Sequence, residues 1–431
     1  MLCSNIGINE SGHLTFAGED TVRLAAHYKT PLYLMDEDRI RENCRVYKAA
    51  MARAFGEGSF PLYASKAASF KRIYAIMQDE GMAIDVVSAG EIATAKRAGF
   101  QMERAFFHGN NKTDADLVQA LDMGVGTIVA DNEDELCALS ALAAAKGVCQ
   151  RILLRITPGI DPHTHKAIRT GNVDSKFGSA IATGQAAAIV KKALSLRGVR
   201  LAGFHCHIGS QIFDITPFAD AAGIMMDFIA AVKKETGFEA EELNLGGGLG
   251  VPYTEYDRTV DYAAAIGKIA ENARAHAARA GVALPRVILE PGRSLVAAAG
   301  ITLYTVGSVK EIPGFRNYVS IDGGMPDNPR YALYQSTYTV LIANRAGAPK
   351  DYRATIAGRC CESGDLIGEN LPLQKPQRGD ILAVLTTGAY NYSMASNYNR
   401  IPRPPVILVK DGTARVAVRR ESFEDLVRND L

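Results

Sequence analysis

Eight short apolar runs, separated by segments with helical periodicity, constrain the fold of this chain more than any other feature of its sequence. The first four follow one another at intervals of about twenty to twenty-five residues, the size of a strand–helix unit. Residues 262–277 place apolar side chains on one helical face, and Gly281 follows where a helix C-terminal cap belongs. The runs are Leu62–Ser65, Ala83–Val87, Ala105–His108, Thr127–Ala130, Arg151–Ile156, Leu201–His205, Glu242–Leu245 and Arg286–Leu289.

Eight parallel strands with helices between them predict an α/β protein built on a (β/α)8 TIM barrel over residues 37–298. An open doubly wound sheet would need a glycine-rich turn after its first strand, and the sequence has none there. Beyond residue 300 the runs become short and rich in Val, Ile, Thr and Tyr, and Asp411-Gly412 marks a hairpin. We expect a β-sandwich or barrel-like β domain over 299–431 that also takes in residues 1–36 through a strand at Pro31–Met35.

Composition excludes several classes of partner. Of 431 residues, 47% are hydrophobic and 22% charged, and the net charge of +1 offers no field that would recruit nucleic acid or an anionic membrane. No apolar run approaches the ~18 residues that span a bilayer, and we expect no signal peptide. The seven cysteines lack zinc-type CxxC pairing, so we expect a reduced, cytoplasmic protein without a metal.

The stretch Phe60–Ala67 reads as a buried strand that delivers Lys66 at its carboxyl end. Low-dielectric surroundings would lower the pKa of this amine and make it a nucleophile that can form a Schiff base. The alternative is that Lys66 closes the strand and points its ammonium group at water.

Active sites of such barrels lie at the carboxyl ends of the strands. These ends carry a lysine, imidazoles, a glycine run and a carboxylate beside an arginine, and together they fit pyridoxal phosphate (PLP). Its aldehyde needs a lysine, its phosphate needs glycine N–H groups, and its ring nitrogen needs a facing carboxylate. The residues are Lys66, Asp85, Ser88, His108, His205, His207, Gly246–Gly248 and Glu290–Arg293.

Two other classes fit parts of this pattern. A metal-dependent hydrolase on the same barrel would use His205 and His207, which share a strand face. The histidines and acids expected to complete such a site at neighbouring strand ends are missing. A non-catalytic PLP carrier would need the lysine but would have no use for the appended β domain.

The ordered motifs identify the chain as similar to the fold type III PLP-dependent decarboxylases over nearly its whole length. Each motif alone is weak, but their order and spacing are highly specific. The motifs are Tyr63–Ala67, Asp85–Glu91, Thr170-Gly171, Ser175–Gly178, His205–Gln211, Gly246–Gly248, Glu290–Arg293, Asp322–Arg330, Cys361–Asp365 and Gly388–Met394.

The resemblance implies a role for each matching residue. Lys66 is the Schiff-base lysine, Glu290 pairs with the pyridine nitrogen, and His207 stacks on the ring. Cys361 reprotonates Cα from the neighbouring subunit, so the resemblance also implies a homodimer with shared active sites. The implied cofactor-binding residues are Lys66, Asp85, His207, Ser210, Gly248, Glu290, Gly292, Arg293 and Tyr390, and the implied substrate-binding residues are Arg293, Arg330, Tyr334, Glu362 and Tyr390.

The resemblance further implies decarboxylation of meso-2,6-diaminoheptanedioate to L-lysine and CO2, the last step of lysine biosynthesis. A two-carboxylate, two-amine substrate wants arginines for its carboxylates and an acid for an amine, which agrees with these residue types. The alternative is a relative that acts on another basic amino acid or on carboxynorspermidine. His163, His165 and Arg169 follow the fifth strand, and we assign them no role.

Overall fold

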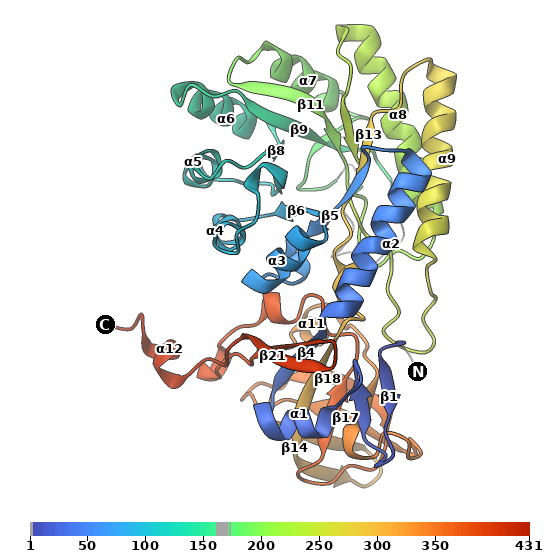
Figure 1. Ribbon diagram of the computed structural model, residues 1–431, viewed down its shortest axis with the longest axis vertical. Helices are drawn as coiled ribbons and strands as arrows, with labels where there is room; N and C mark the ends of the chain where they lie inside the picture. The colour runs from blue at the N-terminus through green and yellow to red at the C-terminus, as the bar shows by residue number, and fades with distance from the viewer. Residues whose placement is uncertain (1–2, 161–170, 172–173) are drawn as a thin grey trace. The chain divides into compact units, whose positions relative to one another are not determined.

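The computed structural model describes residues 3–160, 171 and 174–431. The chain forms two compact units, each described by itself (Figure 1). The barrel unit comprises Asn43–Gly250 and Thr259–Gly292, and the β unit comprises Met1–Glu42, Val251–Arg258 and Arg293–Leu431.

Eight parallel strands close into a ring in the barrel unit. Each strand pairs with the next around the ring, and β13 pairs with β5 to complete it. The interior is filled by side chains such as Leu62, Phe106 and Leu153, which are buried. In ring order the strands are β5 (Phe60–Ala64), β6 (Ala83–Val86), β7 (Ala105–Phe107), β8 (Thr127–Ala130), β9 (Gln150–Thr157), β11 (Val199–His205), β12 (Glu242–Asn244) and β13 (Arg286–Leu289).

The predicted (β/α)8 barrel is confirmed, because each predicted strand lies within two residues of an observed one at either end. Helices lie outside the strands (Figure 1). The short strand β10 (Ser179–Ala180) adds to β9. The helices are α2 (Glu37–Phe55), α3 (Lys71–Asp79), α4 (Ala89–Arg97), α5 (Asp114–Asp122), α6 (Glu133–Ala145), α7 (Gln185–Ser195), α8 (Thr216–Thr236) and α9 (Tyr262–Ala280).

Helix α9 shows why the sequence pattern was informative. Its buried face is Ala265, Ile266, Ile269, Ala270, Ala273 and Ala277. Asp261 caps the N-terminus, and Gly281 adopts the left-handed conformation at the C-terminus, as predicted. No helix among the described residues is both long enough and apolar enough to cross a bilayer.

The β unit is organised around β4 (Leu32–Asp36), which confirms that the N-terminal strand joins the β domain. This strand lies between β14 (Gly300–Ile312) and β20 (Val406–Lys410). The sheet order is β18-β17-β15-β14-β4-β20-β21, and β19 pairs with both β14 and β16. The other strands are β15 (Arg316–Ile321), β16 (Val340–Ile342), β17 (Tyr352–Ala357), β18 (Leu366–Leu373), β19 (Ile381–Val384) and β21 (Thr413–Val418).

The hairpin predicted at Asp411-Gly412 joins β20 to β21, and both turn residues have positive φ. Strand β18 was not predicted, and neither was a small N-terminal sheet of β1 (Ile6–Ile8), β2 (Leu14–Phe16) and β3 (Glu19–Asp20). Strands β1 to β3 are only two or three residues long, and Gly368, Glu369 and Pro372 interrupt the apolar run of β18, so their apolar pattern is weak. The unit's helices are α1 (Thr21–Tyr28), α10 (Arg293–Val296), α11 (Arg330–Tyr334) and α12 (Phe423–Val427).

Candidate active site

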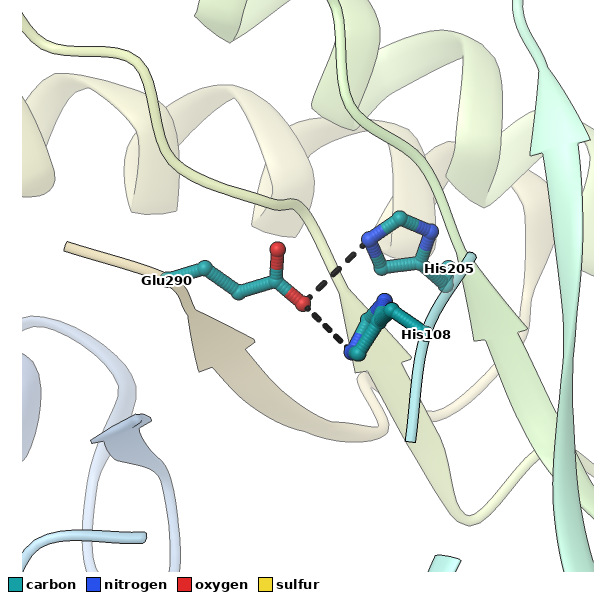
Figure 2. Close-up of side chains that lie close together, drawn as sticks. All are labelled: His108, His205 and Glu290. Atoms are coloured by element: carbon teal, nitrogen blue, oxygen red, sulfur yellow. Dashed lines mark ion pairs between the residues drawn. The ribbon is translucent and has the colours of Figure 1, made fainter. Parts of the chain in front are cut away.

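The carboxylate of Glu290, directly after β13, is the centre of a buried polar cluster in the barrel unit. Asn244 Nδ2 donates a hydrogen bond to its Oε1 at 2.7 Å. His108 Nε2 and His205 Nε2 lie 3.2 and 3.3 Å from the same oxygen (Figure 2). Oε2 of Glu290 makes no hydrogen bond to any residue that the structure describes. One carboxylate oxygen is therefore held, and the other is available to a ligand.

Burial sets the protonation states around this carboxylate. It lowers the pKa of both His108 and His205 well below the ordinary value, and the charge of Arg155 adds to the effect. Both imidazoles are therefore neutral at neutral pH. Burial, followed by the negative charge of Glu290, raises the pKa of Asp85 well above its ordinary range. The site thus disfavours a second negative charge beside Glu290.

Lys66 lies just beyond β5, in a single 3-10 turn over Ser65–Ala67. Its side chain is exposed, so the expectation that burial surrounds this amine with a low dielectric is wrong. The strand ends at Ala64, and the turn carries Lys66 past the apolar barrel interior. Its positive charge partly offsets the burial that raises the pKa of Asp85 and of Glu91. Lys66 therefore lies close enough to the carboxyl groups of Asp85 and Glu91 for its charge to act on both.

The ring of His207 is fixed by the glycine turn that follows β12. The N–H of Gly247 donates to His207 Nδ1 at 3.3 Å, and the N–H of Gly246 donates to Asn244 Oδ1 at 2.9 Å. Burial, followed by the charge of Lys66, lowers the pKa of His207 well below its ordinary value. A neutral aromatic face is therefore held in the same unit as the lysine.

Gly248 has a backbone conformation that requires glycine. Its φ is +120°, and a Cβ there would overlap the carbonyl oxygen of Gly209. Its own carbonyl accepts a hydrogen bond from the N–H of Ile212 at 3.0 Å, which ties the loop carrying Ser210 to the glycine turn. Among the described residues, the N–H groups of Gly248 and Gly292 have no hydrogen-bond acceptor.

These groups fit pyridoxal phosphate. The barrel unit offers an amine at Lys66, a neutral ring at His207 and a carboxylate with one available oxygen at Glu290. The N–H groups of Gly248 and Gly292 are suited to a phosphate, because backbone N–H groups approached without Cβ interference bind such anions.

The same cluster also has the donor types of a transition-metal site, since ligand atoms of His108, His205 and Glu290 lie within 4.8 Å of one another. The predicted alternative of a metal site built on His205 and His207 is not what the structure arranges. His205 lies beside His108, whereas His207 is bonded to Gly247. The positive charge of Arg155, which depresses the pKa of both His108 and His205, also opposes a dication here.

A second group of predicted residues lies within the β unit. The guanidinium carbons of Arg293 and Arg330 are 4.7 and 5.5 Å from the ring centroid of Tyr390, and each is 5.8 Å from that of Tyr253. Arg293 also donates to the hydroxyl of Tyr253 at 2.6 Å. Tyr334 faces Arg330 with a centroid distance of 5.5 Å. The guanidinium groups of Arg293 and Arg330 thus lie against the same two rings, those of Tyr253 and Tyr390.

Arg330 is 6% exposed, yet it forms no ion pair with any carboxylate in the described part of the chain. It donates to Ser336 Oγ at 3.2 Å, and its buried Nε has no partner there. A buried cation without a counter-ion is costly, so the arrangement favours an anionic ligand.

Cys361 and Glu362 are exposed on a loop fixed by the buried Asp365. The carboxylate of Asp365 accepts hydrogen bonds from the N–H groups of Met325 at 2.6 Å and Cys360 at 2.7 Å. The N–H of Cys361 donates to Asn399. Neither Cys361 nor Glu362 is bonded to Arg330, Tyr334 or Tyr390 within the residues described. The loop is therefore anchored by Asp365 and Asn399.

Several residues of these clusters were not singled out from the sequence. Asn244 could have been found as the last residue of a barrel strand, but an asparagine there also reads as an ordinary turn signal. Ser88, expected at the barrel mouth, instead caps α4. His163, His165, Arg169 and Thr170 lie outside the described residues. The other unpredicted members are Arg155, Tyr253, Tyr338 and Asn391.

The chain matches known proteins over nearly its whole length. Residues 37–297 match the family described as "Pyridoxal-dependent decarboxylase, pyridoxal binding domain". The chain is similar to the diaminopimelate decarboxylase of Bacillus subtilis, with 47% identity over 98% of this chain and 96% of that one. It is also similar to a crystal structure of diaminopimelate decarboxylase from M. jannaschii with L-lysine, at 35% identity, TM-score 0.91, and coverage of 100% and 99%.

A lysine/ornithine decarboxylase from Vibrio vulnificus shares the fold at 23% identity and TM-score 0.76, with 91% and 98% of the two chains covered. The chain belongs to the pyridoxal-dependent decarboxylases, which are carboxy-lyases that use pyridoxal phosphate as cofactor. Within that class it belongs to the diaminopimelate decarboxylase family.

Proposed function

We propose that this enzyme decarboxylates meso-2,6-diaminoheptanedioate to L-lysine and CO2 in lysine biosynthesis. The observation that carries the substrate choice is Arg330, a buried guanidinium without a carboxylate partner among the described residues. A substrate that keeps a second carboxylate can supply that partner, whereas ornithine or lysine as substrate loses its one carboxylate in the reaction. Arginine binds carboxylates with two parallel hydrogen bonds, which suits this role.

In this proposal the barrel unit holds the cofactor and controls its charge. When bound, PLP supplies an electron sink for the carbanion left by departing CO2. Lys66 would hold its aldehyde carbon covalently, and Glu290 would keep its ring nitrogen protonated. His207 would cover the ring face and exclude water. Ser210, Gly248 and Gly292, with Tyr390, are the proposed phosphate contacts.

Asp85 is the remaining acid near Lys66. Because burial and Glu290 raise its pKa, its protonated form is favoured, and that form can donate to an acceptor beside the Lys66 amine. That arrangement keeps one formal negative charge, on Glu290, where a protonated ring nitrogen needs it.

The proton that replaces CO2 at Cα is assigned to the thiol of Cys361, and Glu362 is assigned to the distal amine of the substrate. Both are exposed on their loop, which is what a residue serving a neighbouring subunit requires. Burial and Asp365 raise the pKa of the adjacent Cys360 thiol to about 12, so Cys360 is assigned no role in proton transfer. We therefore propose a homodimer with shared active sites.

All seven cysteines are free thiols, which supports the proposal of a reducing, cytoplasmic setting. We further propose residues 37–298 as the PLP-binding domain, with 1–36 and 299–431 as the β domain.

The test is a paired substrate assay on purified PLP-loaded enzyme. Release of CO2 and formation of L-lysine from meso-2,6-diaminoheptanedioate are expected at a kcat/KM far above that for L-ornithine, L-lysine or carboxynorspermidine. Equal or better turnover of any of those three would replace the proposed substrate.

A further inference from the structure

Three nitrogen atoms from three different strands converge on a single oxygen of Glu290. We call His108, His205 and Asn244 the Oε1 triad. Their nitrogens lie 3.2, 3.3 and 2.7 Å from Glu290 Oε1. Each member is nearly or fully buried, at 4%, 1% and 0% exposure. So many polar groups in a barrel interior are costly unless they serve one another or a ligand.

The fold builds this convergence from both sides of the barrel. His205 and Asn244 are the last residues of β11 and β12 and lie opposite each other in the parallel register. His108 follows β7, which is not adjacent to either strand in the ring. Its ring nevertheless lies 4.8 Å from that of His205, at an interplanar angle of 71°. His108 therefore reaches across the interior to the same carboxylate (Figure 2).

The chemistry of the triad suits a carboxylate that must be held in one orientation. Asn244 donates a hydrogen bond to Oε1, and a neutral imidazole can direct one N–H at an anion without adding a charge. Such donors fix the rotation of a carboxylate. Among the described residues Oε2 receives no hydrogen bond, so that oxygen remains available to a ligand.

We propose that the Oε1 triad positions Glu290, holding one carboxylate oxygen so that the other remains available for the ring nitrogen of PLP. This inference rests on the role of Glu290 in the proposed function. The triad members are positioning residues, since they act through Glu290 and not on the reacting atoms.

The experiment uses enzyme reconstituted with PLP that carries ¹⁵N at the ring nitrogen. Its ¹⁵N chemical shift reports whether that nitrogen is protonated, independently of turnover. The variants are His108→Ala combined with His205→Ala, His108→Gln combined with His205→Gln, and His108→Phe alone. Glu290→Gln provides the reference for loss of the carboxylate. The matched control is His276→Ala, because His276 also pairs with a carboxylate, Asp227, but lies on α9 away from the cluster.

We expect the double alanine variant to move the ¹⁵N shift from its wild-type value toward that of Glu290→Gln. Its kcat should fall roughly tenfold to a hundredfold, the scale of a lost interaction with a charged group, because the two imidazoles no longer pack against Glu290 Oε1, while KM changes little. The glutamine pair keeps N–H donors and should restore most of the wild-type ¹⁵N shift and of kcat. His276→Ala should match wild type in both. His108→Phe fills the barrel without a donor and should move the shift in the same direction, which decides the question if the double alanine variant does not fold.

A wild-type ¹⁵N shift in both the double alanine variant and His108→Phe, with Glu290→Gln changed, would overturn the inference and leave the proposed role of Glu290 intact. An unchanged shift in Glu290→Gln itself would overturn both.

Discussion

Replacing Arg330 by methionine should separate substrate binding from stability. Methionine keeps an unbranched stem against Tyr253, Tyr334 and Tyr390 but removes the guanidinium that lies 5.5 to 5.8 Å from their rings. Each hydrogen bond to a charged group contributes about 1.5–3 kcal/mol, so losing a two-bond carboxylate contact costs at least about 3 kcal/mol. At about 1.4 kcal/mol per factor of ten, kcat/KM should fall roughly 150-fold.

The same change should leave the fold within about 1 kcal/mol of wild type, because the lost cation–π contacts are offset by removing a buried cation that has no carboxylate partner in the described chain. Thermal unfolding of the variant and of wild type measures this difference in stability. Inhibition by L-lysine, which keeps one carboxylate, should weaken by a factor similar to that for the substrate, whereas inhibition by cadaverine, which has none, should not change. Arg353→Met, which alters an exposed arginine of the same unit, is the control. Equal weakening of cadaverine and L-lysine, or a kcat/KM within twofold of wild type, would refute the carboxylate role.

Three further predictions follow from the roles and environments described above. Lys66→Ala should abolish the visible absorbance of lysine-bound PLP, and borohydride treatment followed by peptide mass analysis should find no labelled residue 66; a labelled lysine elsewhere would contradict the assignment. Cys361→Ala should keep that absorbance but lose turnover, and mixing it with Lys66→Ala should recover about one quarter of wild-type activity if subunits of a symmetric dimer exchange and share sites; no recovery after subunit exchange is demonstrated would argue against sharing. Burial raises the pKa of Asp327 to about 7, so its contribution to stability is present at low pH and is lost as pH rises from about 4 to 7, by an amount on the order of 4 kcal/mol. Denaturant unfolding should show wild type losing stability relative to Asp327→Asn over that range, and the opposite slope would exclude this cause.

The barrel was predictable because its signal is local and repeated. Each strand is a short apolar run, and each helix, such as α9, carries its own periodicity and end signals. The small strands β1 to β3, each two or three residues long, and strand β18, whose apolar run is interrupted by Gly368, Glu369 and Pro372, were missed because they carry little local pattern and are stabilised by pairing with neighbouring strands. Strand β18, for example, depends on pairing with β17.

The candidate site divides in the same way. Residues at strand ends, such as His108, His205 and Glu290, could be listed from the sequence, since parallel strands bring their carboxyl ends to one face. The sequence did not show which of these residues contact one another. Glu290 has its closest contacts with Asn244, which no motif marked, and the exposure of Lys66 depends on a turn of three residues. The distances that define the Oε1 triad exist only after the ring closes.

The position of β4 in the middle of its sheet has a consequence for how the protein is made. This strand is synthesised before both of its partners, since it pairs with residues 300–303 on one side and 406–409 on the other. The sheet therefore cannot be completed on a nascent chain until residues 406–409 have been synthesised. Until then the backbone of β4 lacks one partner strand, and apolar residues such as Leu32 and Leu34, which are buried in the folded protein, stay exposed. Such a state is prone to aggregation. Termination after residue 400 should thus leave β4 without one of its two partner strands.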